Sequence, residues 1–200
     1  MPRSLVLLAA AFLAALVLAP ASLAVDVHLR VEGKTATIFG PTQPLVATPG
    51  NALAALESAA LLGEFYYHVA TSSFGSYVDQ IGLYSAAGTG GWVFKVNGAS
   101  PPVGADKIQL ANGDRVLWYW ADFGVAPDGP PTLDLRRQPR NCYQVWKQDA
   151  QGKATRAAGA ILFVDGRRLV TSHGRACLRS KKHGLVRAQL AGAVRSQAIR

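Results

Sequence analysis

Short runs in which apolar and polar residues alternate recur along most of this chain, and they constrain its fold more than any other feature. Val25–Val31 and Cys142–Lys147 are two such runs. A period of two places apolar side chains on one face of a β-strand. The runs are separated by turns rich in Gly and Pro, of which the 200 residues include 20 and 11. These features exclude a helical bundle and predict a mainly β fold.

One helix is expected, from Ala52 to Leu62. Asn51 is a suitable N-cap for it, and Gly63 would lie just beyond its C-terminus. An apolar side of this helix would cover a sheet, and it is made of Leu53, Leu56, Ala60 and Leu61. The sequence therefore predicts a mainly β protein with one helix.

Residues 1–24 have the pattern of a secretory signal peptide. Arg3 supplies the positive region, an uncharged apolar run of about 15 residues follows, and Ala24 is a suitable cleavage position. The alternative is a membrane anchor, which needs about 20 apolar residues. We expect cleavage, no transmembrane span in the mature chain, and a secreted or extracellular protein that is associated with the cell envelope.

Charge divides the mature chain into two regions. Residues 25–131 contain five basic and nine acidic residues, whereas residues 132–200 contain fifteen basic and three acidic ones. The boundary is the Gly- and Pro-rich segment 124–131, which is typical of a linker. We predict an acidic domain at 25–123 and a basic domain at 132–200, and their opposite charges favour docking.

The first domain has the element order of a β-grasp (α+β) fold. A hairpin is expected from Val25–Val31 and Thr35–Phe39, and the helix follows. The remaining expected strands are Phe65–Val69, Tyr77–Ile81, Gly91–Asn97 and Asp114–Trp120. A hairpin, a helix and further strands around that helix predict a β-grasp.

Several phrases in this region resemble the DUF4430 family. They are Tyr77–Ile81, the strand and turn Gly91–Gly98, Gly104–Asp106, and Asn112–Asp114 followed by the aromatic strand Val116–Tyr119. The resemblance spans roughly residues 27–123. The family is similar to the C-terminal β-domain of transcobalamin and intrinsic factor, so the resemblance implies a β-grasp and, as one alternative, cobalamin binding.

Candidate ligand-binding residues in this domain are aromatic: Trp92, Trp118, Trp120, Tyr66 and Tyr84. The other interpretation is that the tryptophans are structural, because a period of two places Trp118 and Trp120 on one face of a strand and Tyr119 on the other. In transcobalamin a separate helical barrel holds the other face of cobalamin, and this chain has no such barrel. Low affinity is therefore expected if cobalamin binds, and no other cofactor is predicted.

The second domain is expected to be a small antiparallel β-sandwich. Its expected strands are Thr132–Arg136, Cys142–Lys147, Ala160–Val164, Arg167–Thr171, Arg175–Arg179, Leu185–Leu190 and Ala193–Ile199, with an Asp165-Gly166 hairpin turn. Phrases between Gly159 and Ser196 resemble carboxypeptidase-regulatory-like and bacterial Ig-like domains. Export predicts a Cys142–Cys177 disulfide. A metal site is the alternative, but only His173 lies near Cys177 and no metal is expected.

The basic residues of the second domain allow two interpretations. In the first interpretation they form one patch, which consists of Arg167, Arg168, Arg175, Arg179, Lys181 and Lys182, together with Arg187, Arg195 and Arg200. That patch would attract an anionic envelope polymer. In the second, they are solvated side chains, some of which face the acidic domain. Nucleic acid is not an expected partner, because the chain has no nucleic-acid-binding motif.

The sequence contains no catalytic motif. Neither Gly-x-Ser-x-Gly nor His-Glu-x-x-His occurs, and the four histidines are scattered. We therefore expect no catalytic residues and no enzyme. Three functions stay open: a secreted, non-enzymatic binding or adhesion module of the bacterial envelope; a small-ligand carrier; and an accessory partner of another secreted protein.

Overall fold

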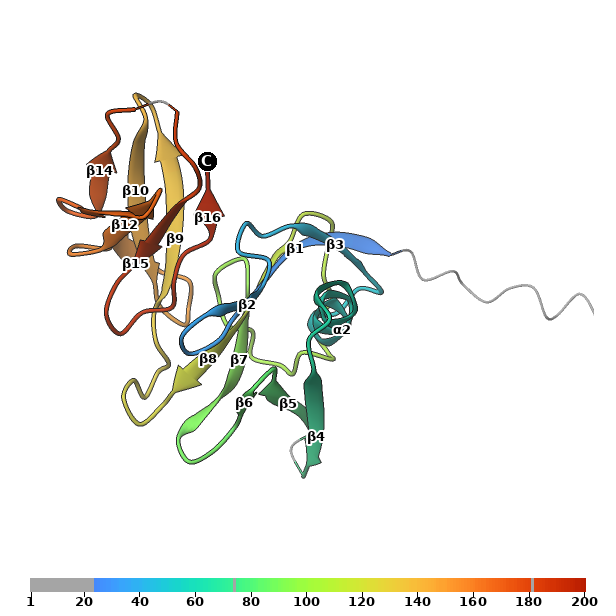
Figure 1. The fold of residues 1–200 in the computed structure, drawn as a ribbon. Helices are drawn as coiled ribbons and strands as arrows, with labels where there is room; N and C mark the ends of the chain where they lie inside the picture. Colours follow the sequence, from blue (N-terminus) through green and yellow to red (C-terminus); the bar gives the residue numbers. More distant parts are fainter. Residues whose placement is uncertain (1–23, 74, 181) are drawn as a thin grey trace, which may run out of the picture.

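The computed structural model describes residues 24–73, 75–180 and 182–200. The described residues form a mainly β structure with a single helix, as predicted (Figure 1). We call residues 25–122 the first part and residues 132–199 the second part, because each has its own hydrophobic core. The predicted signal peptide lies outside the described residues except for Ala24. No helix in the described segments combines the length and apolar character of a membrane span.

The main sheet of the first part has the strand order β2-β1-β8-β7. It contains β1 (Val25–Glu32), β2 (Thr37–Phe39), β7 (Gly90–Val96) and β8 (Arg115–Asp122), and β3 (Leu45–Thr48) pairs with β1. The central strands β1 and β8 run parallel, and every other pair in the sheet is antiparallel. The central parallel pair and one covering helix are the arrangement expected of a β-grasp.

The helix, α2 (Ala52–Gly63), starts where the sequence predicts. The Asn51 side chain accepts a hydrogen bond from Ala54 N at 2.8 Å, which confirms the N-cap. The C-terminus differs by one position, because Gly63 is still helical and Glu64 adopts the left-handed conformation at φ 50°. Leu56 and Ala60 are buried as predicted, whereas Leu61 is 78% exposed and does not belong to the covering face.

A second, three-stranded sheet of the first part has the order β4-β5-β6, from β4 (Tyr67–Ser72), β5 (Gly75–Ile81) and β6 (Tyr84–Ser85). The predicted strand at Phe65–Val69 begins two residues too early, because Phe65 packs beside Phe39 and its N–H bonds the helix carbonyl of Ala60. The alternation around Trp118 is confirmed. Trp118 and Trp120 join the core under α2, and Tyr119 points to the opposite face.

The second part consists of two packed antiparallel sheets. One has the order β11-β10-β14 with β9 also on β10, and it contains β9 (Thr132–Gln138), β10 (Cys142–Gln148), β11 (Ala154–Arg156) and β14 (Arg175–Cys177). The other has the order β13-β12-β15-β16, from β12 (Ile161–Val164), β13 (Arg167–Val170), β15 (Val186–Gln189) and β16 (Ala198–Ile199). Their inner faces share one core, which is the layout of a sandwich.

Two features of the second part test the sequence predictions directly. Cys142 and Cys177 form the predicted disulfide, and they are register partners on β10 and β14. The predicted strand Ala193–Ile199 is wrong except at Ala198–Ile199. Val194 leaves that sheet because its backbone accepts from Leu133 N of β9 and donates to Pro131 O just before β9, and Arg195 turns toward the first part.

The two parts meet on the face of the main sheet that α2 does not cover. Leu117, Tyr119 and Ala121 are buried on this face, and Val194 of the second part packs against them. The main sheet is therefore covered by the helix on one side and contacts the second part on the other.

Candidate functional site

The predicted ligand-binding tryptophans are mostly inside the first core. Trp118 is 2% exposed and Trp92 is 8% exposed. Trp118 Nε1 donates to Ala52 O at 3.3 Å, and Trp92 Nε1 donates to Tyr84 O at 2.8 Å. Since both indole N–H groups have backbone partners, their hydrogen bonds hold the fold together rather than face a ligand.

Tyr84 and Trp120 belong to the same aromatic cluster. The rings of Tyr84 and Trp120 lie 6.3 Å apart, and those of Trp92 and Trp120 lie 5.7 Å apart in an edge-on arrangement. Trp120 keeps part of its surface exposed, and the ammonium of Lys34 lies 4.2 Å from the centre of its ring. Tyr66 is 58% exposed and lies between α2 and β4. The five predicted residues thus do not form one surface.

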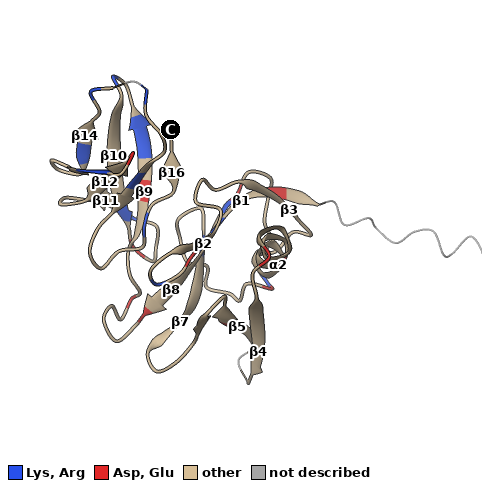
Figure 2. Cartoon of the chain, viewed as in Figure 1, with Lys and Arg blue, Asp and Glu red and all other residues tan. Residues whose placement is uncertain are grey.

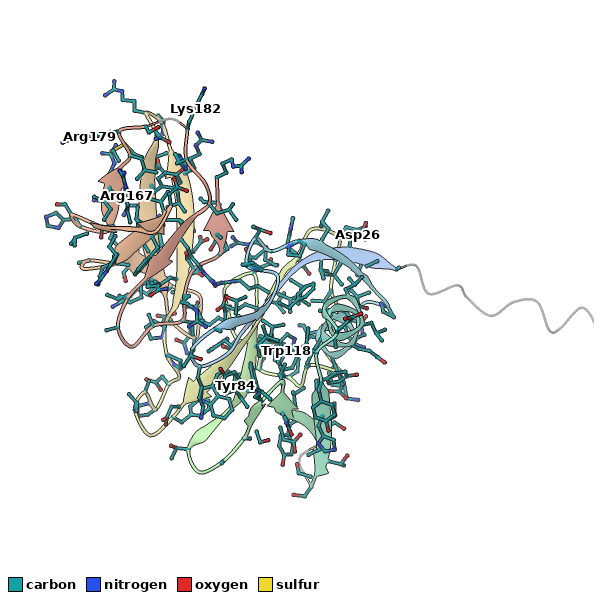
Figure 3. The ribbon with its side chains drawn as sticks, viewed as in Figure 1. Asp26, Tyr84, Trp118, Arg167, Arg179 and Lys182 are labelled. Carbon is teal, nitrogen blue, oxygen red and sulfur yellow. A yellow bond between two sulfur atoms is a disulfide. The ribbon has the colours of Figure 1, made fainter. Side chains whose placement is uncertain are left out.

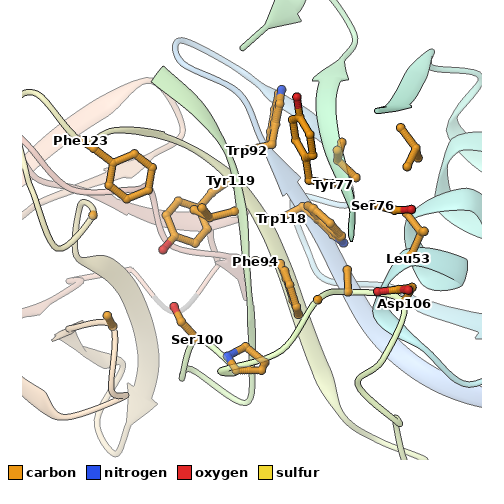
Figure 4. Close-up of a pocket in the computed structure, with 18 of the residues that line it drawn as sticks. Leu53, Ser76, Tyr77, Trp92, Phe94, Ser100, Asp106, Trp118, Tyr119 and Phe123 are labelled. Carbon is orange, nitrogen blue, oxygen red and sulfur yellow. The ribbon is translucent and has the colours of Figure 1, made fainter. Parts of the chain in front are cut away.

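An apolar cavity of about 340 Å³ lies beside the edge strand β7 (Figure 4). Its lining includes Phe94, Trp118 and Tyr77, and Asp106 contributes a carboxylate. The Phe94 and Trp118 rings stack with centroids 5.1 Å apart. The aromatic side chains of this region are therefore core on one side and cavity wall on the other, which the sequence pattern alone does not separate.

At the junction of the two parts, Glu32 is surrounded by three arginines. Its side chain is 1% exposed and pairs with Arg30 of the same strand at 3.1 Å. Arg195 of the second part reaches Oε2 at 3.0 Å, and Arg187 pairs with Oε1. The Thr37 hydroxyl donates to the same carboxylate at 3.0 Å. The buried carboxylate of Glu32 therefore links the two parts through its ion pairs with Arg187 and Arg195.

A buried lysine forms a second link between the parts. Lys95 is 1% exposed, and its ammonium donates to Thr132 Oγ1 at 3.1 Å, to Gln148 O at 3.2 Å and to Asp149 O at 2.6 Å. Burial lowers the pKa of Lys95 to about 8, and the nearby Asp149 charge offsets this effect only in part.

Many Lys and Arg positions lie on the second part (Figure 2), and Figure 3 labels Arg167, Arg179 and Lys182 among them, but only part of the predicted basic patch is exposed. Arg167, Arg168, Arg175, Arg179 and Lys182 are exposed, and Lys181 lies outside the described residues. Arg187 and Arg195 do not belong to a free patch, because their side chains are 19% and 16% exposed and pair with Glu32. For these two residues the alternative interpretation, contact with the acidic domain, is the right one.

Sequence reasoning missed Glu32 and Lys95 as junction residues, and it missed Trp146. Trp146 lies on the outer face of the β9–β10–β11 sheet, in register with Asp134 and Arg156, and the Arg136 guanidinium is 5.4 Å from its ring centre. The available signal was the alternation in Cys142–Lys147, which places Trp146 opposite the buried Val145.

Candidate metal-binding side chains do not gather in the described segments. Among these residues, no group of three or more His, Cys, Asp or Glu side chains could hold a metal ion. His68 Nδ1 and Asp79 Oδ1 lie 2.7 Å apart on an exposed part of β4 and β5. The His183 ring contacts Tyr143 and Asn141 in the second part.

Comparison with known proteins gives a partial match. Residues 55–122 match the model of DUF4430, a domain of unknown function. The match runs from α2 to the end of β8 and confirms the resemblance for that segment. No curated protein is significantly similar to the chain. Among solved structures, a proposed metal binding protein from Ruminococcus gnavus ATCC 29149 aligns over 49% of this chain and 97% of its own, with 13% identity and a TM-score of 0.37.

Proposed function

We propose that the chain is an exported, non-enzymatic binding module of the cell envelope, which attaches to an anionic polymer through its second part. The supporting observation is the unbalanced charge of that part. Arg167, Arg168, Arg175, Arg179 and Lys182 are exposed, and none of them forms an ion pair with a described residue.

The few carboxylates of the second part are engaged elsewhere. Asp134 is buried and pairs with Arg136 at 2.7 Å and with Arg115 at 3.6 Å. Asp165 accepts from Gly184 N, and Asp149 accepts from Lys153 N. Unpaired surface charges of one sign create a potential that attracts polyanions, and salt weakens this attraction.

The first test is retention of the mature chain, beginning at Val25, on purified cell envelope over a salt series. We expect strong retention at low salt and release as the ionic strength rises. Arg179→Glu should lower the salt concentration of release more than Lys107→Glu. The two variants change the net charge equally, but Lys107 is in the first part and pairs with Asp106. No retention at low salt would refute the proposal.

Attachment to another secreted protein is the competing form of this proposal. Co-purification from culture medium separates the two, because a protein partner would stay bound after envelope polymers are removed. Detection of a mature chain that starts at Val25 outside the cell tests the export on which both depend.

Cobalamin binding stays a prediction from the resemblance. The cavity beside β7 has a volume of about 340 Å³, which suits a small ligand, and a corrin ring would cover the opening rather than enter it. Titration with hydroxocobalamin, followed by tryptophan fluorescence, tests this alternative. A flat titration would remove it without affecting the polymer-binding proposal.

A further inference from the structure

Two cavities adjoin each other where the second part meets the turn between β1 and β2. The first has a volume of about 370 Å³, and its lining includes Lys34, Trp120 and Asp122. The second, of about 380 Å³, lies on the β12–β15 sheet and is lined by Phe163 and Arg168 among others. Ala193 and Arg195 line both cavities. We call the two cavities together the junction groove.

The groove has a cation at each end, and each cation lies near an aromatic ring. The Lys34 ammonium is 4.2 Å from the centre of the Trp120 ring. The Arg168 guanidinium is 5.7 Å from the centre of the Phe163 ring, and these two residues are register partners on β13 and β12. Such contacts hold a flexible cationic side chain near one position.

Arg195 supplies a third cation between the two ends. Its guanidinium bonds Glu32 and the backbone oxygen of Gly33 at 2.7 Å, so its position is fixed from the first part. Its side chain remains 16% exposed, which leaves it within reach of a ligand in the groove. The cations thus extend from one cavity to the other across Ala193 and Arg195.

Positive charge exceeds negative charge along this groove. Three cations of its lining, Lys34, Arg168 and Arg195, stand against two carboxylates, Glu32 and Asp122. Glu32 is also paired with Arg30 and Arg187, which lie outside the lining. The pKa of Asp122 is lowered, mainly by a hydrogen bond from the Thr89 hydroxyl, so this carboxyl group stays ionised.

Glu32 cannot neutralise its three arginine neighbours alone. Arg30 is 2% exposed, and its Nε has no hydrogen-bond partner among the described residues. Burial lowers the pKa of Arg30 to about 10, yet the group keeps its proton at neutral pH. Desolvated charges that share one carboxylate are only partly compensated, so an anion in the adjoining groove would stabilise Arg195.

We propose that the junction groove binds an anionic glycan, that is, a sugar chain that carries phosphate or carboxylate groups. This inference rests on the proposed function and names its site and ligand class. The groove has apolar walls against which the C–H faces of sugar rings can pack, and these walls are formed by Val125, Pro130, Ile161 and Leu190. The guanidinium groups of Arg168 and Arg195 suit the planar or tetrahedral anions on such a chain.

The test is the affinity of the mature chain for short, labelled glycans, measured by fluorescence anisotropy. A uronic-acid oligosaccharide and a phosphate-bearing wall glycopolymer fragment present the two anions. Neutral dextran, polyphosphate and an oligonucleotide are the comparison ligands. We expect both charged glycans to bind at least tenfold more tightly than each comparison ligand. Tighter binding of polyphosphate or the oligonucleotide, or equal binding of dextran, would overturn the glycan assignment.

The decisive variant is Lys34→Gln combined with Arg168→Gln, since both side chains are exposed and neither forms an ion pair with a described residue. Its matched control is Lys153→Gln combined with Arg156→Gln, which removes the same charge from exposed residues of the second part that line neither cavity. We expect a loss of at least tenfold for the groove variant and less than threefold for the control. Ala193→Glu, which places a carboxylate in the shared wall, should give a comparable loss.

The two proposals fail in different ways. If the control pair weakens envelope retention as much as the groove pair and short glycans bind both variants alike, the groove is not the site, but the second part still binds polyanions. If the unmodified chain binds no anionic polymer at low salt, the proposed function fails together with the groove.

Discussion

Replacing Glu32 by Gln tests whether one buried carboxylate holds the two parts together. The substitution keeps the size of the side chain and one carbonyl oxygen, but it removes the negative charge that Arg30, Arg187 and Arg195 share. Three guanidinium groups would then face each other without a counter-charge at the junction.

The expected cost follows from the burial of the group. Glu32 is 1% exposed, and removal of one partner of a buried ion pair costs about 3–5 kcal/mol. For a protein of this size, each 1 kcal/mol lowers the unfolding midpoint by roughly 2–4 °C. We therefore expect the midpoint of Glu32→Gln to fall by about 6–20 °C.

Differential scanning calorimetry provides the assay, with Glu57→Gln as the matched control. Glu57 is exposed on α2 and forms no ion pair with a described residue, so its replacement should shift the midpoint by less than about 2 °C. Arg195→Met in the Glu32→Gln background should recover part of the loss, because one uncompensated charge is removed. Equal midpoints for Glu32→Gln and Glu57→Gln would refute the reasoning.

Three further predictions concern other parts of the molecule. The folded-state pKa of Lys95 is about 8, against an ordinary value of 10.5. Between these pH values the unfolded chain binds more protons, so the free energy of unfolding rises with pH. Lys95→Met should remove this rise, as measured by urea unfolding from pH 7.5 to 10. Loss of the Cys142–Cys177 disulfide in a double Ala variant should destabilise the second part by roughly 3–4 kcal/mol in calorimetry, since the bridge spans a sequence separation of 35. Gly174→Ala should lower the free energy of unfolding by about 2 kcal/mol or more, measured by chemical denaturation, and Gly166→Ala should lower it less. Both glycines have positive φ, but only at Gly174 would a Cβ lie 2.9 Å from a backbone oxygen of β10.

Local features of the fold could be predicted because each depends on few neighbours. Asn51 caps α2 as expected, and Asp165-Gly166 forms a hairpin turn in which both residues have positive φ. The alternation in β8 correctly separates Trp118 from Tyr119. These outcomes depend on backbone geometry within a few residues, which a sequence pattern specifies directly.

Features that depend on contacts across the chain could not be predicted. Ala193–Gln197 alternates like a strand, but Val194 pairs with the start of β9 and Arg195 binds Glu32, more than 160 positions away. β3 was not expected, because its segment follows Pro41 and Pro44 and pairs only with β1. The sequence pattern likewise does not distinguish which aromatic residues of the first part lie in the core, line the cavity or face the surface.

The charge asymmetry of the chain predicted the attraction between its parts but not its form. Summed over each part, opposite charge suggests many weak surface contacts, each of small energy. The structure instead places the attraction in a few buried groups, above all at Glu32, where three guanidinium groups meet one carboxylate. Because one negative charge cannot balance three positive charges, docking of the parts leaves positive charge beside the groove that it creates. The same residues that join the two parts therefore favour an anion at their boundary, and this links the architecture to the proposed binding of polyanions.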